Sequence, residues 1–460
     1  MEYFFTEKEE PNNPFNKFKK YKVLTPARIL VLGFLTFILL GALLLSLPFA
    51  VIPGKELSFL DAIFTATSAV CVTGLVVVDT GTTFTRLGQT VILLLIQIGG
   101  LGFMTFATLF FILLGRKITL KERLLLQEAL NQVSIEGIVR LTKNVIQFSF
   151  SIQFIGISIL FLRWSGEMGW QKALYFGIFH SISAFNNAGF DLFGEFRSLT
   201  GYTEDIVTNI TVMFLIITGG IGFFVLSDLY VHKLRKLSLH TRVVLWISLL
   251  LIVSGSIAFF ILEFNNPHTI GNLDPMEKVL ASVFQSVTTR TAGFNSIDIT
   301  QMRATSQLFM MILMFIGASP GSTGGGIKTT TLISIVLFVI STFRGNVHVT
   351  LRKRTLPRDI IQKAIAITSM GLILILIVTS LLTITESADF IIILFEAVSA
   401  FATVGLSLGL TLQLSSIGKI AIAFTMFIGR VGPLTLAFAL GKNRQKLNQM
   451  KYPDERIIIG

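Results

Sequence analysis

Long apolar stretches separated by short polar segments dominate the chain. A helix needs about 20 apolar residues to cross the core of a bilayer. Eight stretches come near this length, at residues 28–48, 90–114, 144–163, 206–230, 243–262, 307–342, 361–383 and 417–440. The sixth is longer than a span requires and contains GASPGSTGGGIKTT (317–330). The pattern predicts an all-α polytopic membrane protein with eight transmembrane helices.

The eight long stretches form four consecutive pairs, and one shorter apolar segment lies between the two members of each pair. Each of these four segments contains a glycine close to its end. Segments of this length are typical of re-entrant or buried helices. They read FLDAIFTATSAVCVTGL (59–75), YFGIFHSISAFNNAGF (175–190), VLASVFQSVTTRTAGF (279–294) and ILFEAVSAFATVGL (393–406).

The same order of elements recurs four times, with the glycines Gly74, Gly189, Gly293 and Gly405 just over 100 residues apart. Each unit contains a span, a short helix, a glycine turn and a span, so each starts and ends on the same side of the membrane. We therefore expect four parallel repeats around a pseudo-fourfold axis. The expected divisions are an N-terminal tail (1–23), repeat 1 (24–123), repeat 2 (124–240), repeat 3 with a broken second span (241–355), repeat 4 (356–445) and a C-terminal tail (446–460).

Composition supports a membrane location. Of 460 residues, 52% are hydrophobic and 14% are charged, whereas soluble domains carry about 25% charged residues. The net charge of +12 does not indicate nucleic-acid binding, because the basic residues cluster between apolar stretches. A single cysteine excludes an intrachain disulfide, and five scattered histidines show no spacing typical of a metal site.

The distribution of basic residues predicts the orientation. Basic clusters lie before the first stretch and after the second, fourth and sixth, whereas the opposite loops are acidic. By the positive-inside rule, both termini are expected in the cytoplasm of a multi-pass protein of the plasma membrane. The clusters are Lys17, Lys19, Lys20, Lys22 and Arg28; Arg116, Lys117, Lys121 and Arg123; Lys233, Arg235, Lys236 and Arg242; and Arg344, Arg352, Lys353, Arg354 and Arg358.

Four convergent glycine turns suit a cation. The C-terminal end of each short helix carries partial negative charge, and carbonyls of four extended strands can replace the hydration shell of an ion. Glycines also pack membrane helices closely, but four in the same place favour a pore. The candidate filter strands are Cys71, Val72, Thr73 and Gly74; Asn186, Asn187, Ala188 and Gly189; Arg290, Thr291, Ala292 and Gly293; and Ala402, Thr403, Val404 and Gly405.

The sequences TSAVCVTGL, SAFNNAGF, TTRTAGF and SAFATVGL, in this order among eight spans, resemble the Trk/Ktr/HKT potassium-uptake superfamily. The chain is most similar to the bacterial KtrB-type ion-translocating subunit, over essentially residues 24–445. The resemblance implies a pathway for K+ through a filter of backbone carbonyls. The serine that some sodium-transporting relatives carry in the first repeat is absent, because position 74 is glycine.

The resemblance also implies partners. KtrB-like proteins form homodimers and pair with a separate cytosolic ring of nucleotide-binding regulatory subunits. The basic faces 115–123, 232–242 and 343–358 are candidate docking surfaces, although positive-inside topology alone would also produce them. The tail YPDERIIIG (452–460) is a candidate dimer contact.

The glycine-rich run has two competing interpretations. A phosphate-binding loop reads G-x-x-x-x-G-K-[ST] between a strand and a helix, but here Ile327 separates Gly326 from Lys328 and the flanks are apolar. Proline and repeated glycine instead break a helix. By resemblance, this run is an intramembrane gating loop beneath the filter. Its candidate residues are Gly317, Ala318, Ser319, Pro320, Gly321, Ser322, Thr323, Gly324, Gly325, Gly326 and Lys328.

Arg430 lies inside the eighth stretch, in MFIGRVGPLTLAF. An arginine at bilayer depth costs at least about 2.5–3.5 kcal/mol on insertion scales, so it needs oxygen partners. The carbonyls of 317–326 are candidates. A structural clamp between helices is one interpretation, and the resemblance implies a second, in which the charge helps to close the pore.

Three further features remain open at this level. Arg290 is expected to turn away from the lumen and bond carbonyls behind its strand. Asn186 and Asn187 either brace the second strand or line the outer mouth. The glycines of QIGGLGF (97–103) and ITGGIGF (217–223) are expected to pack helices, with mild kinks.

Two other classes of function compete with a potassium-selective pore. A Na+- or H+-coupled symporter needs an embedded carboxylate, and Glu396 and Asp228 are the candidates. A phosphate-handling enzyme needs a nucleophile or base, but 317–330 contains no His, Cys, Asp or Glu. We therefore expect a transporter rather than an enzyme. The chain should bind no cofactor of its own, with K+ as the transported ion and Na+ as a candidate activating or coupling ion.

Overall fold

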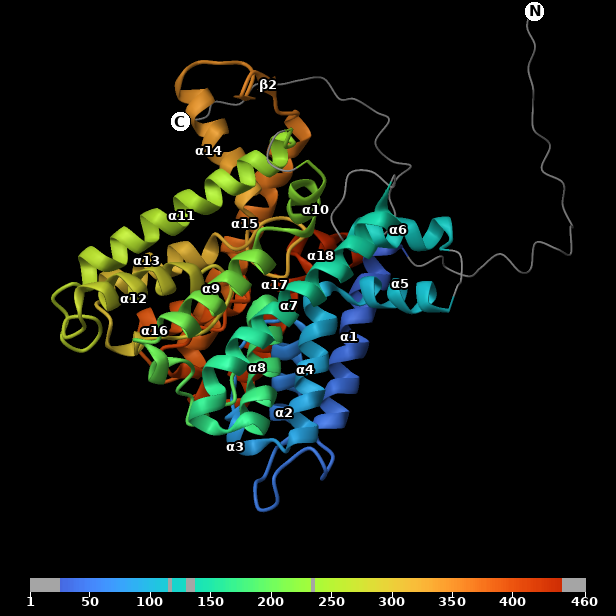
Figure 1. Ribbon diagram of the computed structural model, residues 1–460. Coiled ribbons are helices and arrows are strands. Elements are labelled where there is room, and N and C mark those ends of the chain that lie inside the picture. The colour runs from blue at the N-terminus through green and yellow to red at the C-terminus, as the bar shows by residue number, and fades with distance from the viewer. Residues whose placement is uncertain (1–24, 115–117, 130–136, 233–235, 441–460) are drawn as a thin grey trace, which may run out of the picture.

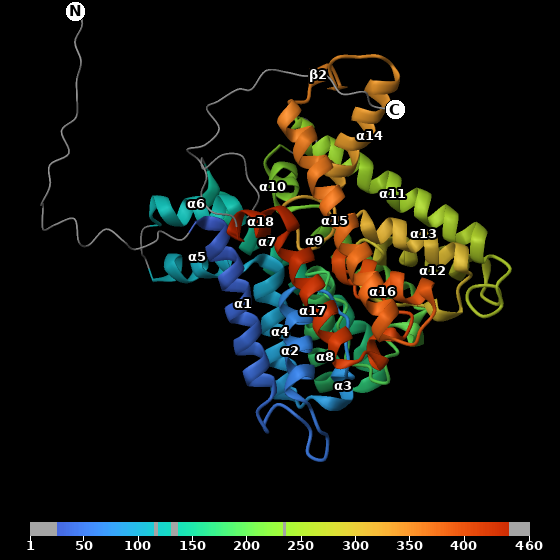
Figure 2. The same cartoon turned by 180° about the vertical axis from the view of Figure 1, so that it is seen from behind.

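The computed structural model describes residues 25–114, 118–129, 137–232 and 236–440. Both expected tails and many residues of the basic clusters lie outside these ranges, as does YPDERIIIG. Helices form nearly all of the regular structure (Figures 1 and 2), and the described strands are one antiparallel pair, β1 (Thr350–Leu351) and β2 (Arg354–Thr355). The expectation of a mostly helical protein is confirmed.

Four helices are long and apolar enough to cross a membrane by themselves. Apolar side chains lie on the outer surface of these helices: Leu39 and Leu43 of the first helix are 51% and 55% exposed. The helices are α1 (Pro26–Leu45), α7 (Ile138–Met168), α11 (Leu239–Glu263) and α15 (Arg358–Thr385).

Four shorter helices correspond to the predicted short segments and are buried toward their C-terminal ends. Local sequence defines where they start: the side chain of Ser58 caps the first, and Asp274 with Glu277 forms a capping box on the third. The helices are α2 (Phe59–Val70), α8 (Trp170–Phe185), α12 (Pro275–Thr288) and α16 (Phe390–Ala402).

Three of the remaining apolar stretches are sharply bent. The pairs α4 (Arg86–Leu101) with α5 (Phe103–Leu113), α9 (Ile206–Gly220) with α10 (Phe223–His232), and α17 (Ser416–Val431) with α18 (Pro433–Leu440) turn by 95°, 95° and 94°. The expectation of mild kinks at the first two is wrong. The bends lie at Gly102, Gly222 and Gly432, whose φ values of 81°, 99° and 91° end a helix.

The sixth stretch contains α13 (Ala304–Phe315) and α14 (Thr329–Phe343), and residues 316–328 between them are not helical. Short elements complete the described chain: α3 (Thr80–Thr83), α6 (Leu120–Ala129), η2 (Thr200–Tyr202), η3 (Ile299–Gln301) and η4 (Leu410–Gln413).

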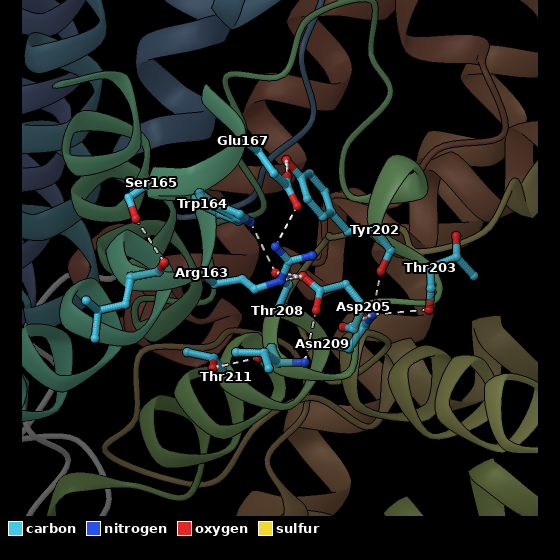
Figure 3. A network of polar contacts seen from close by, with 12 residues as sticks. Arg163, Trp164, Ser165, Glu167, Tyr202, Thr203, Asp205, Thr208, Asn209 and Thr211 are labelled. Atoms are coloured by element: carbon cyan, nitrogen blue, oxygen red, sulfur yellow. Dashed lines mark hydrogen bonds and ion pairs between the residues drawn. The ribbon is translucent and has the colours of Figure 1, made fainter. Parts of the chain in front are cut away.

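Acidic residues tie the ends of three of the long helices to the start of the apolar helix that follows the next short helix. Figure 3 shows this for α7 and α9, where Arg163 Nε lies 3.0 Å from Asp205 and Arg163 Nη1 lies 2.5 Å from Glu167. At the end of α11, the buried Glu263 accepts from Arg303 N at 3.0 Å. At the end of α15, Glu386 accepts from Ser415 N at 3.0 Å. These ties fix helix pairs whose inner ends are bent or broken.

Candidate functional site

The four short helices each end in a segment of unusual backbone conformation. In every segment, the residue two positions before the glycine has positive φ: Val72 (58°), Asn187 (58°), Thr291 (67°) and Thr403 (51°). Left-handed conformation is rare for β-branched residues. Such strain is tolerated where the surrounding structure enforces it, typically at functional sites.

The four glycines close a ring. A side-chain carbon at Gly74 would overlap the carbonyl of Ala188, and one at Gly189 would lie 2.9 Å from the carbonyl of Ala292. In the same way, Gly293 faces the carbonyl of Val404 and Gly405 faces that of Thr73, which returns to the first strand. No larger residue fits at these positions, so the structure brings all four predicted strands around one axis.

Hydroxyl groups on the short helices anchor each strand. Gly74 N donates to Ser68 Oγ at 3.0 Å and Gly405 N donates to Ser399 Oγ at 3.2 Å. In the other two strands, Ser183 Oγ donates to Phe190 O at 2.8 Å and Thr288 Oγ1 donates to Phe294 O at 2.6 Å. Sequence reasoning missed these residues, although a Ser or Thr recurs five or six positions before each glycine.

The polar residues of the second and third strands point away from the ring. Asn186 Nδ2 donates to Gln97 Oε1 at 2.6 Å, and Asn187 Nδ2 donates to the carbonyl of Arg290 at 3.2 Å. Both asparagines therefore brace strands. Arg290 Nη2 donates to Ser248 Oγ at 3.0 Å, so its acceptor is a hydroxyl of α11 rather than the expected carbonyl.

The residues 317–326 lie against the ends of α9 and of the short helices. Ser319 N and Thr323 N donate to the carbonyls of Gly220 and Gly219, at 3.0 and 3.2 Å. Phe223 N donates to the carbonyl of Gly321 at 2.8 Å, and Gly222 approaches the carbonyl of Pro320. The loop is thus held by backbone hydrogen bonds at the bend between α9 and α10.

The same loop touches the filter strands directly. Thr323 Oγ1 donates to Asn187 Oδ1 at 3.2 Å. A side chain at Gly324 would overlap Thr291 Oγ1, and one at Gly325 would overlap Thr403 Oγ1. Glycine is therefore required for this close approach.

The remaining candidate gating residues make contacts within the loop 317–326 or with the residues at its two ends. Ser322 Oγ donates to the carbonyl of Ser319 at 2.6 Å, and Thr329 N donates to the carbonyl of Ala318 at 3.3 Å. Gly317 and Gly326 lie against each other where the loop starts and ends.

Two basic side chains hold the loop through its carbonyls. Arg430 donates to the carbonyls of Thr323 and Gly99, and to that of Gly100 at 3.1 Å. Lys328 Nζ donates to the carbonyl of Gly324 at 2.6 Å. Both side chains border a cavity of about 610 Å³ whose lining includes residues of the loop and no residue of the four filter strands. The arrangement places two basic side chains against the carbonyls of the loop.

The model of the TrkH family, described as a cation transport protein, matches residues 18–449. The chain belongs to this family. It is 48% identical to the Ktr system potassium uptake protein B of Bacillus subtilis, covering 97% of this chain and 99% of the relative. It is 42% identical to the protein of the same name from Vibrio alginolyticus, covering 94% of each.

Two further likenesses extend the comparison. The potassium/sodium uptake protein NtpJ of Enterococcus hirae is 41% identical, over 95% of this chain and 98% of the relative. The crystal structure of the potassium transporter TrkH from Vibrio parahaemolyticus aligns with a TM-score of 0.71 at 18% identity, over 92% of this chain and 86% of that one. The structural similarity to TrkH supports a shared fold.

Membership of the TrkH family makes this chain a membrane ion transporter. The expectation that it is not an enzyme is confirmed, because its relatives are named as ion-uptake proteins.

Proposed function

We propose that this chain is the ion-translocating membrane subunit of a potassium uptake system and that K+ passes through the ring of filter strands. The observation that carries the proposal is the closed ring of Gly74, Gly189, Gly293 and Gly405, in which each glycine faces a carbonyl of the next strand. The two Ktr system relatives, named as potassium uptake proteins, support the choice of ion.

The proposed pathway follows from the arrangement of the helices. Eight transmembrane segments form four parallel repeats, and the four short helices direct the negative ends of their dipoles at the ring. Backbone carbonyls of the strands take the place of the hydration shell of the ion. No side chain occupies the ring because all four positions are glycine.

The loop 317–326 acts as the gate in this proposal. It lies directly beneath Thr291 and Thr403 of the filter and is held by Arg430 and Lys328. Opening requires these hydrogen bonds to break, and until then two positive charges repel an arriving cation. A gate of this kind needs two arrangements close in energy, which a glycine-rich loop provides.

The orientation and the partners form part of the same proposal. Both termini lie in the cytoplasm of a plasma-membrane protein, by the positive-inside rule. The chain forms a homodimer and binds a cytosolic ring of nucleotide-binding subunits through the basic faces. The Ktr system relatives, whose name designates one protein of a system, support the existence of a partner.

Ion flux into liposomes containing the purified protein tests the proposal. Influx of K+ and of Na+ is measured separately, without proton or sodium gradients, for the wild type and for Gly293→Ser. We expect faster influx of K+ than of Na+ in the wild type and a loss of this preference in the variant, because a side chain at Gly293 meets the carbonyl of Val404. A variant that keeps the wild-type preference would contradict the filter.

The same assay separates passive conduction from coupled transport. The relative named as a potassium/sodium uptake protein makes sodium coupling the second candidate. Uptake that requires a Na+ or H+ gradient would favour a symporter on this scaffold. If neither cation moves, addition of the cognate cytosolic subunit distinguishes a closed gate from an incorrect assignment of the pore.

A further inference from the structure

Each short helix carries a buried polar residue at the same level. Thr65, His180 and Glu396 precede the filter glycine of their repeat by nine residues and Gln285 precedes its glycine by eight, and all four are 0% exposed. The third repeat is one residue shorter here. Ala292 N donates to the carbonyl of the residue four positions earlier, whereas the equivalent N–H groups of the other three repeats donate to the carbonyl five positions earlier. Burial of a polar group is costly unless it is hydrogen-bonded, so the partners indicate what these residues do.

His180 and Gln285 both reach the chain that follows the filter. His180 Nδ1 lies 2.8 Å from the carbonyl of Phe176 and therefore carries the proton, while Nε2 accepts from Leu192 N at 3.3 Å. Gln285 Nε2 donates to Ser296 Oγ at 3.4 Å. Leu192 and Ser296 each lie three residues after the filter glycine of their repeat.

Glu396 makes the same connection in the fourth repeat with two bonds. Ser407 Oγ donates to Oε2 at 2.8 Å, and Thr411 Oγ1 donates to Oε1. Ser407 lies two residues after Gly405. Among the described residues, no Lys, Arg or His forms an ion pair with this carboxylate. Its partners thus belong to the segment that follows the filter glycine of the fourth repeat.

The filter strands need this support. They have no regular secondary structure, and the hydroxyl anchors at Ser68, Ser183, Thr288 and Ser399 reach no further than the glycine or the residue after it. Beyond that point, side chains from the short helices bond the following chain in repeats 2, 3 and 4. In repeat 3, hydrogen bonds of Asn295 and Ser296 with residues 198–203 add to this connection. In repeat 1, Thr65 Oγ1 has no hydrogen-bond partner among the described residues.

We propose that His180, Gln285 and Glu396 are positioning residues that fix the outer ends of three filter strands and so set the preference for K+ over Na+. The proposal rests on the proposed function. A filter discriminates between ions by the number and spacing of its carbonyls, and a strand released at one end can close around the smaller ion. Repeat 1 lacks such a connection, so its strand depends on its neighbours.

The ratio of K+ to Na+ influx in liposomes tests the proposal, with Glu396→Ala as the main variant. We expect its ratio to fall about three- to tenfold, as the loss of one or two buried hydrogen bonds implies. Glu396→Gln should keep the wild-type ratio, because an amide can accept from Thr411 and donate to Ser407. Thr65→Val is the matched control at the equivalent position, and its ratio should not change.

The outcomes separate the inference from the proposed function. A wild-type ratio in Glu396→Ala, with normal yield and a monodisperse protein, would overturn the positioning role and leave the pore in place. An equal loss in Glu396→Gln and Glu396→Ala would also overturn it, since charge and not geometry would then be decisive. If Glu396→Ala does not fold, Ser407→Ala removes the other end of the same bond and must lower the ratio. A wild type without preference for K+ would instead contradict the proposed function.

Discussion

Arg430 and Lys328 bond backbone carbonyls and, among the described residues, pair with no carboxylate. Carbonyl dipoles compensate a full charge only in part, and interactions between charges are strong where water is scarce. The two side chains therefore maintain a positive potential beneath the filter for as long as the loop is in place. In the proposed mechanism, opening moves both the loop and this potential away from the path of the ion.

Replacement of Arg430 by alanine should raise the K+ influx at least about tenfold, because several charge-assisted hydrogen bonds to the closed loop are lost. The measurement is influx into liposomes at matched protein content. Arg430→Lys retains the charge but cannot reach three carbonyls at once, so it should give an intermediate rate. Unchanged or lower influx in Arg430→Ala, at normal yield, would favour the structural clamp.

Among individual residues, the sequence pattern predicted the filter glycines, which recur in all four repeats. It did not predict the side chains that hold the filter strands in place. The filter glycines are identical in all four repeats, which made them visible. Their outer supports differ in type, as His180, Gln285 and Glu396 do, and share only a distance from the glycine. Partners such as Ser248 for Arg290 depend on tertiary contacts that no local pattern encodes.

At the scale of the elements, the bends are the main difference between expectation and structure. Apolar residues continue through Gly102 and Gly222 without interruption, so hydropathy alone predicts continuous spans. Only the spacing G-x-x-G, shared by 99–102, 219–222 and 429–432, marks the turn. The break at 316–328 was predictable because proline and several glycines interrupt an otherwise apolar stretch.

Gly222→Ala should raise the K+ influx, and Gly102→Ala should not. Both glycines have positive φ, so alanine strains the backbone at either position by roughly 1–2 kcal/mol. Only at Gly222 does the added carbon meet the loop, at 2.6 Å from the carbonyl of Pro320, whereas Gly102 has open space. Melting temperature and influx are measured for both variants. Equal influx in the two would mean that this contact does not hold the gate.

At the scale of the whole molecule, the first and fourth repeats must meet to complete the ring. Gly405 lies against Gly74, and α17 packs against α2 (Figure 2). Lys419 Nζ lies 2.6 Å from Asp61 Oδ1 at the same boundary, with side chains 20% and 16% exposed. The parallel order of the repeats predicted a contact between these distant segments. The sequence did not predict which residues form that contact.

Lys419→Met should lower the free energy of unfolding by roughly 1–3 kcal/mol, because Asp61 then keeps its hydrogen bond from Ser58 but loses its ion-pair partner in a largely buried position. Lys363→Met is the control: its pair with Asp359 spans 3.8 Å and both side chains are more than half exposed, so about 0–0.5 kcal/mol is expected. Thermal unfolding in detergent gives both values. Similar melting temperatures for the two variants would show that the boundary does not depend on this pair.

The non-helical break between α13 and α14 occurs in one repeat out of four, whereas the other three second spans turn at a single glycine. A pore built from four identical chains would have four copies of any moving part, and its response to a stimulus could be sigmoidal through their coupling. In the mechanism proposed here, a single loop moves within one chain. The response of an isolated chain should therefore follow a simple two-state curve with a Hill coefficient of about 1, and any steeper response must originate in the assembly of chains around it.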